Sequence, residues 1–409
     1  MNTKIQHRAL YYAMAVLLFF SAPLPANEKI SGQSVEPVNM EQAKTVSAVF
    51  DHAGRLWLAW VVGEHLYVNY SDDKGKSYSL PVKVNDEAQR IGSHGESRPQ
   101  IAVARNGHVY VVYNQKLAKR FTGNVRFSRS IDHGKSFSKP EIIHDDRQLI
   151  GHSFAVLAVN HQGHVYMTWL DGRDAAESRK GSREYIGSSL YYSVSFDGGE
   201  TFRSDVKLQD HSCQCCRIAM ALDQHGLPVI AWRQIFNKTT RDHALIRFTG
   251  PVTFSPMLRA SQDQWTIDSC PHHGPALSIS ETGRYHFTWF TGAAERAGIY
   301  YAHSDDGGQR FSSPLSLGDS RTQAQHPFVL SAHEQVFIVW KTFDGKSTSI
   351  QLIHSVDNGN HWSKPRTVAH SDKDSDHPFL IADGEHVYLS WHTEASGYRL
   401  ITLDEGESE

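Results

Sequence analysis

The chain alternates short apolar runs with polar turns, and this pattern recurs seven times. Each copy has an alternating apolar run, a polar turn that often holds glycine, and a second alternating run ending in Trp or Tyr. Such a pattern is typical of a β-hairpin. The copies are VSAVFDHAGRLWLAW from Val46, PQIAVARNGHVYVVY from Pro99, AVLAVNHQGHVYMTW from Ala155, IAMALDQHGLPVIAW from Ile218, PALSISETGRYHFTW from Pro275, PFVLSAHEQVFIVW from Pro327 and PFLIADGEHVYLSW from Pro378. A spacing of about 50 residues predicts an all-β repeat architecture.

A second string, Ser-x-Asp-x-Gly-x-x-aromatic, follows five of the hairpins. We expect a tight turn in which the Asp carboxylate caps backbone N–H groups, the Gly takes a positive φ and the aromatic residue anchors the turn. After the fourth hairpin only a degenerate version remains, FTGPVTF from Phe248. The structural aspartates predicted by this string are Asp73, Asp132, Asp197, Asp306 and Asp357.

This string resembles the Asp box, or BNR repeat, of the sialidase (neuraminidase) superfamily, over essentially the whole chain after residue 26. The resemblance implies a β-propeller of four-stranded blades, with each Asp box joining the third and fourth strands. Sialidases imply six blades, whereas the hairpins here predict seven; six stays open if one hairpin serves elsewhere. The segment SGQSVEPVNM from Ser31 resembles the outer strands of other repeats. We therefore expect an N-terminal strand to close the last blade.

The N-terminus predicts export. Lys4 and Arg8 precede an apolar run from Ala9 to Ala22, which indicates a signal peptide over residues 1–26 and a single propeller domain over 27–409. An uncleaved anchor is the alternative, and we expect no stable membrane insertion after cleavage because no later run has 18 apolar residues. The protein is then periplasmic or secreted. A net charge of −3 gives no basic field for nucleic acid.

Three of the four cysteines lie in one hexapeptide, HSCQCC, and the fourth lies in SCPHHG. Both strings directly precede the first strand of a predicted blade, and His-Pro opens two further blades, so these side chains are expected to converge on one propeller face. We expect each Pro to hold the preceding His in an extended backbone. Thiolate and imidazole together suit copper or zinc. The predicted metal ligands are Cys213, Cys215, Cys216, Cys270, His272, His273, His326 and His377.

Disulfides are the alternative for the cysteines, because exported thiols tend to oxidise. A bridge from Cys213 or Cys216 to Cys270 would join two blades. In that case the channel face would bind a small molecule, a glycan or a protein without catalysis.

The resemblance also implies a sialidase active site, with three Arg on a carboxylate, a Tyr nucleophile paired with Glu, and an Asp acid/base. The candidate anion-binding residues are Arg98, Arg173 and Arg217. The long loop from Leu170 to Ser189 adds Asp174 and the neighbours Glu184 and Tyr185, but no F/Y-R-I-P string is present. No catalytic residue is assigned, and whether the chain is an enzyme stays open. Three functions compete: a metal-binding propeller, a sialidase-type exo-glycosidase and a non-catalytic glycan- or protein-binding scaffold.

Overall fold

The computed structural model describes residues 38–181 and 184–403. The chain divides into two units, Met1–Pro37 and Val38–Glu409. The predicted signal peptide and the part of the predicted closing strand up to residue 37 lie outside the described residues. Within the described ranges, no helix is long and apolar enough to cross a membrane.

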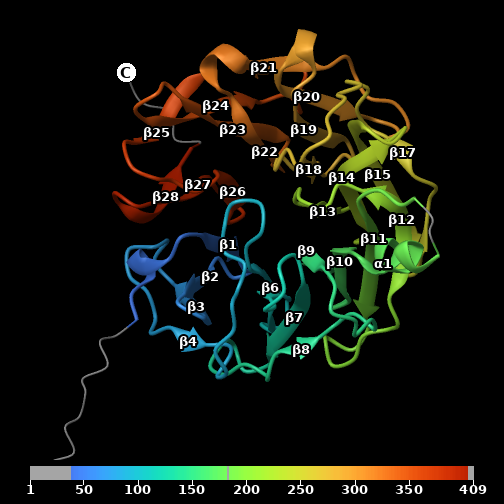
Figure 1. Ribbon diagram of the computed structural model, residues 1–409. Coiled ribbons are helices and arrows are strands. Elements are labelled where there is room, and N and C mark those ends of the chain that lie inside the picture. Colours follow the sequence, from blue (N-terminus) through green and yellow to red (C-terminus); the bar gives the residue numbers. More distant parts are fainter. Residues whose placement is uncertain (1–37, 182–183, 404–409) are drawn as a thin grey trace, which may run out of the picture. The chain divides into compact units, whose positions relative to one another are not determined.

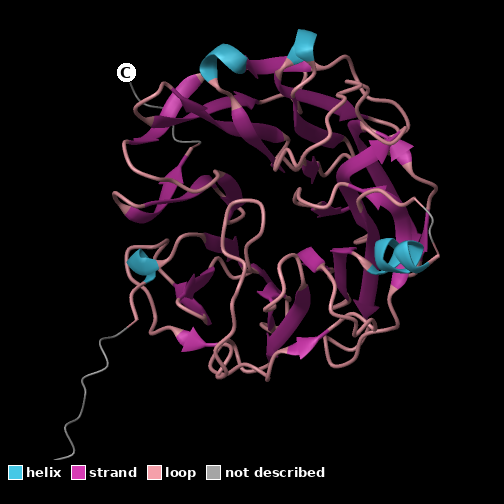
Figure 2. Cartoon of the chain, viewed as in Figure 1, coloured by secondary structure: helices cyan, strands magenta, loops and turns pink. Residues whose placement is uncertain are grey.

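The strands of the second unit form a succession of antiparallel sheets, mostly four-stranded (Figures 1 and 2). The first two sheets are β1 (Val46–Phe50), β2 (Leu56–Val62), β3 (His65–Ser71) and β4 (Val82–Lys83), then β5 (Gln100–Val103), β6 (Val109–Lys116), β7 (Gly123–Ser130) and β8 (Glu141–Ile142). Two further sheets are β18 (Ala276–Ile279), β19 (Tyr285–Thr291), β20 (Gly298–Ser304) and β21 (Leu315–Asp319), then β22 (Gln325–Ala332), β23 (Gln335–Phe343), β24 (Thr348–Ser355) and β25 (Arg366–Ser371).

A nine-stranded sheet holds two repeats, which a single residue pair, Ser212 with Gln234, links edge to edge. Its strands are β9 (His152–Val159), β10 (Val165–Asp171), β11 (Ser188–Ser195), β12 (Val206–Ser212), β13 (Ala219–Leu222), β14 (Pro228–Phe236), β15 (Thr240–Gly250), β16 (Thr253–Phe254) and β17 (Leu258–Arg259). In the described residues the last sheet has three strands, β26 (Phe379–Ala382), β27 (Val387–Thr393) and β28 (Gly397–Thr402).

The first strand of every repeat lies innermost and contacts the first strand of the next repeat. The series runs β1, β5, β9, β13, β18, β22 and β26, and β26 contacts β1 (Figure 1). This closes a ring of blades around a central channel and confirms the predicted β-propeller. The described strands make up seven blades.

The second strand of each blade is buried because neighbouring blades cover both of its faces. β2, for example, reads LWLAWVV with little polar alternation. The aromatic residue that ends each predicted hairpin lies on this strand and is at most 2% exposed. These residues are Trp60, Tyr113, Trp169, Trp232, Trp289, Trp340 and Trp391.

The five predicted Asp turns have the expected capping contacts. In the second blade, Asp132 Oδ1 accepts hydrogen bonds from Ser130 Oγ at 2.7 Å and from the Ser136 backbone N–H at 3.0 Å. His133 and Gly134 follow with φ of 59° and 76°. A Cβ on Gly134 would lie 2.4 Å from the Trp57 ring of the preceding blade, so the turn also fixes the packing between blades. Asp73, Asp197, Asp306 and Asp357 accept the matching bonds.

The long loop after β10 contains a helix that the sequence analysis did not predict. Helix α1 spans Arg173–Lys180, with Asp174 in its first turn and Arg179 and Lys180 in its last. Its Ala, Glu, Arg and Lys residues favour helix, and its end charges suit the helix dipole. Short 3-10 helices cover Met40–Gln42, Ala294–Arg296 and Ser320–Thr322.

Candidate functional site

The loops that run into the inner strands, called here the leading loops, carry most of the predicted site residues. The loop between β4 and β5 reaches over the central opening (Figure 1). Below it a cavity of about 210 Å³ lies between the inner strands. Its lining includes Glu96, Arg98, Arg217, Phe328 and Phe379, which come from four different blades.

Glu96 joins three leading loops through its buried carboxylate. Oε2 accepts hydrogen bonds from the backbone N–H groups of Arg217 at 2.9 Å and Gly274 at 2.8 Å. Oε1 accepts one from Arg217 Nη1 at 2.9 Å. Burial by itself would raise the pKa of the Glu96 carboxyl, but Arg217 and His326 outweigh burial and hold that pKa well below its usual range. Glu96 is therefore a charged, saturated acceptor beside the channel.

Two imidazoles lie against Glu96, and a third lies beside one of them. The rings of His326 and His377 stack at 3.5 Å, and their Nδ1 atoms lie 3.4 Å and 3.7 Å from Glu96 Oε1. His273 lies 4.4 Å from His326 and stacks on Phe290 at 4.0 Å. The donor atoms of Glu96, His326 and His377 lie within 4.8 Å of one another. The ring nitrogens of His326 and His377, however, hold their lone pairs in two nearly parallel planes, so these lone pairs do not converge on one ion. Arg217 also already balances the charge of Glu96. This group is therefore poorly arranged to chelate a cation.

The backbone is distorted at His326, and a glycine makes room for the His377 ring. His326 has a φ of +51°, at a break in the pairing of β22 with β23 between Gln325 and Phe328. The expectation that Pro327 holds His326 in an extended backbone is therefore wrong, because this irregularity in the strand turns the ring toward Glu96. A Cβ on Gly95 would lie 2.2 Å from the His377 ring, so the close approach of this loop requires glycine.

Three thiols form a second group, called here the thiol triad: Cys213, Cys215 and Cys216. Cys213 Sγ lies 3.7 Å from Cys215 Sγ and 3.6 Å from Cys216 Sγ. All three are buried, and Phe154 packs against them. Because Cys215 and Cys216 share hydrogen bonds with it, the pKa of the Cys213 thiol lies well below its usual range. Hydrogen bonding with the other thiols raises the pKa of Cys215, and burial raises that of Cys216, so the triad favours a single thiolate, at Cys213.

The fourth cysteine lies beside the triad on the next blade. The Cys270 thiol interacts with that of Cys215, and this contact lowers the pKa of Cys270 to about 6. Cys270 is exposed, and all four cysteines are free thiols. The structure thus places the fourth predicted cysteine ligand beside a triad whose own sulfurs lie within 4.8 Å of one another, without a disulfide.

Two arginines next to the triad were missed by the sequence analysis. Arg233 is 1% exposed, and it donates to the carbonyl oxygens of Arg241, His273 and Phe290. Arg241 is also buried and donates to the Ile267 carbonyl. Within residues 38–181 and 184–403, neither guanidinium forms an ion pair with a carboxylate. The signal for Arg233 in the sequence was its place directly after Trp232, inside a mostly apolar strand.

The eight predicted metal ligands therefore separate into two groups. The cysteines gather around the triad, whereas His326, His377 and His273 gather around Glu96. His272 lies on the exposed loop with Cys270. The strand alignment suggested a single ring of ligands, but in the tertiary structure these residues lie in two separate groups.

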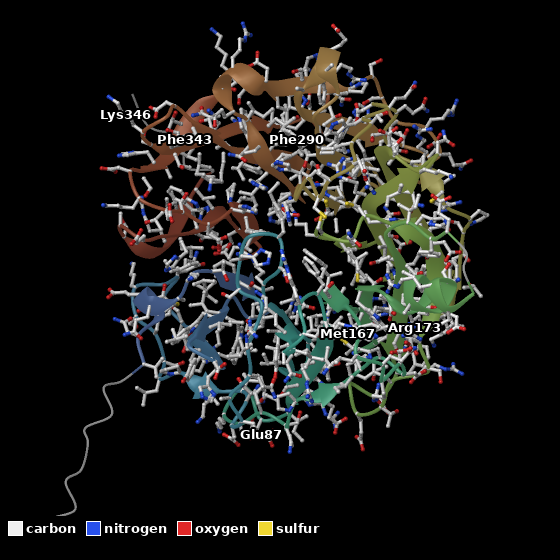
Figure 3. The ribbon with its side chains drawn as sticks, in the orientation of Figure 1. Glu87, Met167, Arg173, Phe290, Phe343 and Lys346 are labelled. Carbon is white, nitrogen blue, oxygen red and sulfur yellow. The ribbon has the colours of Figure 1, made fainter. Side chains whose placement is uncertain are left out.

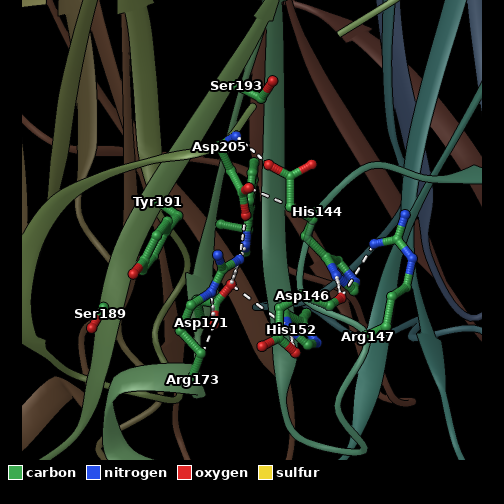
Figure 4. Close-up of polar contacts among 12 residues, drawn as sticks. His144, Asp146, Arg147, His152, Asp171, Arg173, Ser189, Tyr191, Ser193 and Asp205 are labelled. Carbon is green, nitrogen blue, oxygen red and sulfur yellow. Dashed lines mark hydrogen bonds and ion pairs between the residues drawn. The ribbon is translucent and has the colours of Figure 1, made fainter. Parts of the chain in front are cut away.

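Of the three predicted anion-binding arginines, Arg98 and Arg217 lie together over the Phe379 ring at the channel cavity, whereas Arg173 lies elsewhere. Arg98 pairs with buried Asp376, and Arg217 pairs with Glu96. Arg173 pairs with Asp171 and Asp205 (Figure 4), on a part of the ring remote from Phe290 (Figure 3). Each guanidinium already has a carboxylate partner, so none is free to clamp a substrate carboxylate in this arrangement.

The remaining glycosidase candidates have separate partners. Glu184 pairs with Lys238 at 2.7 Å, while the Tyr185 hydroxyl donates to Asp210 at 2.9 Å. Asp174 accepts from Ser189 and Tyr191. Glu184 and Tyr185 therefore do not form a nucleophile pair.

A buried network anchors α1 and β9 near these residues (Figure 4). His144 and His152 stack at 3.6 Å, and His152 Nε2 lies 3.5 Å from Asp146 and 3.7 Å from Asp171. Burial, with the neighbouring His152, lowers the pKa of His144 to about 4. Arg173 completes the network from α1. We assign it a structural role.

Comparison with known proteins identifies the fold and no closer relationship. No protein-family model matches the chain, and no curated protein matches it. Among solved structures, the chain is similar to an ulvan lyase, a polysaccharide lyase bound to -[GlcA(1-4)Rha3S]-, with 12% identity, 88% of this chain and 92% of that chain covered, and a TM-score of 0.57. It is also similar to a Hadza microbial sialidase, with 14% identity, 85% and 73% covered, and a TM-score of 0.51.

A third similar structure is an α-L-arabinanase of Penicillium chrysogenum complexed with arabinobiose. It shares 12% identity over 89% of this chain and 93% of that chain, with a TM-score of 0.50. At these identities the likeness concerns the propeller fold alone.

Proposed function

We propose that the protein is an exported metal-binding β-propeller that holds one thiophilic ion, Cu(I) or Zn(II), at the thiol triad and Cys270. The observation that carries this proposal is the spacing of the sulfur atoms, 3.6 Å and 3.7 Å from Cys213 to its two neighbours. Zn–S bonds of about 2.3 Å at tetrahedral angles separate two sulfurs by about 3.8 Å. A disulfide needs about 2.05 Å, much shorter than either distance.

The surrounding charge supports thiolates at this position. A buried guanidinium without a carboxylate partner is costly unless another anion balances it. Arg233 and Arg241 provide two such charges beside the triad. Two or more metal-bound thiolates supply the missing negative charge, and they would also resist the oxidation that export exposes them to.

The test is reconstitution of the reduced protein without oxygen, with Cu(I) and with Zn(II) separately. We expect about one equivalent retained after desalting, and protection of the triad thiols from a thiol reagent. Cys213→Ser removes the sulfur shared by both short contacts, so it should lose the ion. Retention of no metal, with all four thiols readily oxidised to disulfides, would contradict the proposal.

The matched control is His377→Asn, because His377 was predicted as a ligand but lies with Glu96 rather than with the triad. Full retention of the ion in this variant supports a thiol-only site. Loss of the ion in both variants would instead favour a mixed thiolate–imidazole site, against the proposal.

A glycan in the channel cavity is the second candidate, favoured by the aromatic rings of Phe328 and Phe379 beside Arg98 and Glu96. Membership of the sialidase superfamily, suggested by the Asp turns, belongs with this candidate. Release of fluorophore from a sialic acid reporter would support exo-glycosidase activity. Arg98, Arg217 and Arg173 are each paired with a carboxylate, so we expect no release.

A further inference from the structure

We propose that Cys270 is an exchange ligand, through which the metal ion enters and leaves the buried thiol triad. This inference rests on the proposed function and extends it, from holding an ion to passing it to or from an external thiolate ligand. The juxtaposition behind it is a fixed, buried triad on one blade beside an exposed thiol on a sparsely held loop of the next blade.

The triad is held firmly. The Cys213 backbone N–H donates to the Arg233 carbonyl at 2.9 Å, directly after β12 ends. At the other end of the triad, Arg217 follows Cys216 and is fixed by Glu96 and by the Pro327 carbonyl at 3.0 Å. Both ends of the cysteine segment are thus tied to buried groups, so these three sulfurs have little freedom to move.

Cys270 sits on a loop with the opposite character. The backbone is anchored at Ile267, whose N–H donates to the Thr239 carbonyl, and at Gly274, whose N–H donates to Glu96. Residues 268–272 are all described, and none of their backbone groups forms a hydrogen bond. Asp268, Ser269 and Cys270 are exposed. A segment whose backbone is held only at its ends opens at low free-energy cost compared with the core.

Among the four sulfurs, the exposed one is that of Cys270. Cys213, Cys215 and Cys216 are buried, while the exposed Cys270 contacts Cys215. An external thiolate therefore reaches the Cys215–Cys270 edge of the site before any other sulfur.

The exchange step is a ligand substitution without electron transfer. An incoming thiolate donates a lone pair to the ion as the bond to one cysteine sulfur breaks, and the ion keeps its oxidation state. The proton lost by the incoming thiol passes to the released cysteine thiolate. When the same substitution occurs at Cys215 and then at Cys270, the ion moves outward, and the number of metal–sulfur bonds stays the same. The partner is thus a small thiol or a thiolate-bearing metal carrier.

The test compares Cys270→Ser with the wild type, both loaded with Cu(I), during transfer to the coloured Cu(I) chelator bathocuproine disulfonate. We expect Cys270→Ser to keep about one equivalent but to release it at least tenfold more slowly, and to load more slowly to a similar extent. Ser269→Ala, on the same exposed loop, should release the ion at the wild-type rate. An unchanged or faster release from Cys270→Ser would overturn the exchange role.

The outcomes separate this inference from the proposed function. If the wild type binds no ion, the metal site itself is wrong; if it binds an ion that Cys270→Ser releases as fast, only the exchange role is wrong. A second measurement uses iodoacetamide on the loaded wild type. We expect alkylation of Cys270 alone with the ion retained, whereas protection of Cys270 equal to that of the triad would contradict an exchangeable position.

Discussion

Glu96 is the residue on which the channel face depends. Its two oxygens accept hydrogen bonds from Arg217 and Gly274, which belong to other blades, and they face the imidazoles of His326 and His377. Removing one member of a buried charged pair leaves the other uncompensated, which is much costlier than losing an exposed ion pair. A single carboxylate thus sets the relative positions of several leading loops.

We expect Glu96→Gln to lower the free energy of unfolding by about 3–5 kcal/mol, because Arg217 then keeps a buried charge without a carboxylate. Urea unfolding followed by tryptophan fluorescence measures the change. Glu200→Gln is the control, since the Glu200 side chain is exposed and pairs with Arg129 at 3.4 Å. If Glu96→Gln lowered the free energy of unfolding no more than Glu200→Gln does, the contacts of Glu96 would not stabilise the fold.

The Asp turn is the element that repeats most faithfully. Each copy closes the link from the third to the fourth strand with the same side-chain and backbone hydrogen bonds. Helix α1 and the loop from 268 to 272 are the irregular elements, and both lie on the leading-loop face. The regular turns stabilise one face of the ring, and the irregular segments build the other.

Asp132→Ala should lower the free energy of unfolding by about 1–3 kcal/mol, because it removes a charged acceptor of the hydrogen bonds from Ser130 and Ser136. Thermal unfolding by circular dichroism measures the loss. The same change at the exposed Asp86 should cost less than about 0.5 kcal/mol. Equal effects at the two positions would argue against a stabilising role for the capped turn.

Buried histidines on different blades make the stability of the fold depend on pH. Burial lowers the pKa of His286 to about 4, and burial with the neighbouring His152 does the same for His144, on different blades of the ring. Between pH 6.5 and 4 the unfolded chain binds more protons at these sites than the folded protein does, so stability falls as the pH falls. The Asp turns act in a lower window: side-chain hydrogen bonds lower the pKa of Asp132 to about 2, so its contribution is lost only below about pH 4.

We expect the urea midpoint to decrease from pH 7 to pH 5, and His286→Gln to flatten this dependence by up to about 1.4 kcal/mol per pH unit. His286 contacts the Tyr301 hydroxyl and Asn358, both within hydrogen-bonding distance, so Gln keeps a polar group there. His52→Gln, at an exposed position, is the control. An unchanged pH dependence in His286→Gln would mean that this histidine is not kept neutral by burial.

Local features of the fold could be predicted from the sequence better than contacts between distant residues. The hairpins, the aromatic residue at the end of each second strand and the Asp turns follow from patterns within about 15 residues, because strand alternation and turn conformation are local properties. Helix α1 was missed because its charged sequence also suits a solvated loop. The four cysteines were predicted to meet, but not their separation from the imidazoles.

By itself, the sequence determined the repeat, the propeller fold and the loops that carry the unusual residues. Only the tertiary structure decided which of those residues touch. Glu96 meets Arg217 across 121 positions and Gly274 across 178. Arg233 comes to lie by the triad and pairs with no carboxylate in the part of the chain that the structure describes. Such pairings depend on how closed blades bring loops over one channel. No local sequence pattern encodes these contacts between loops, because they arise from the packing of every blade in the ring.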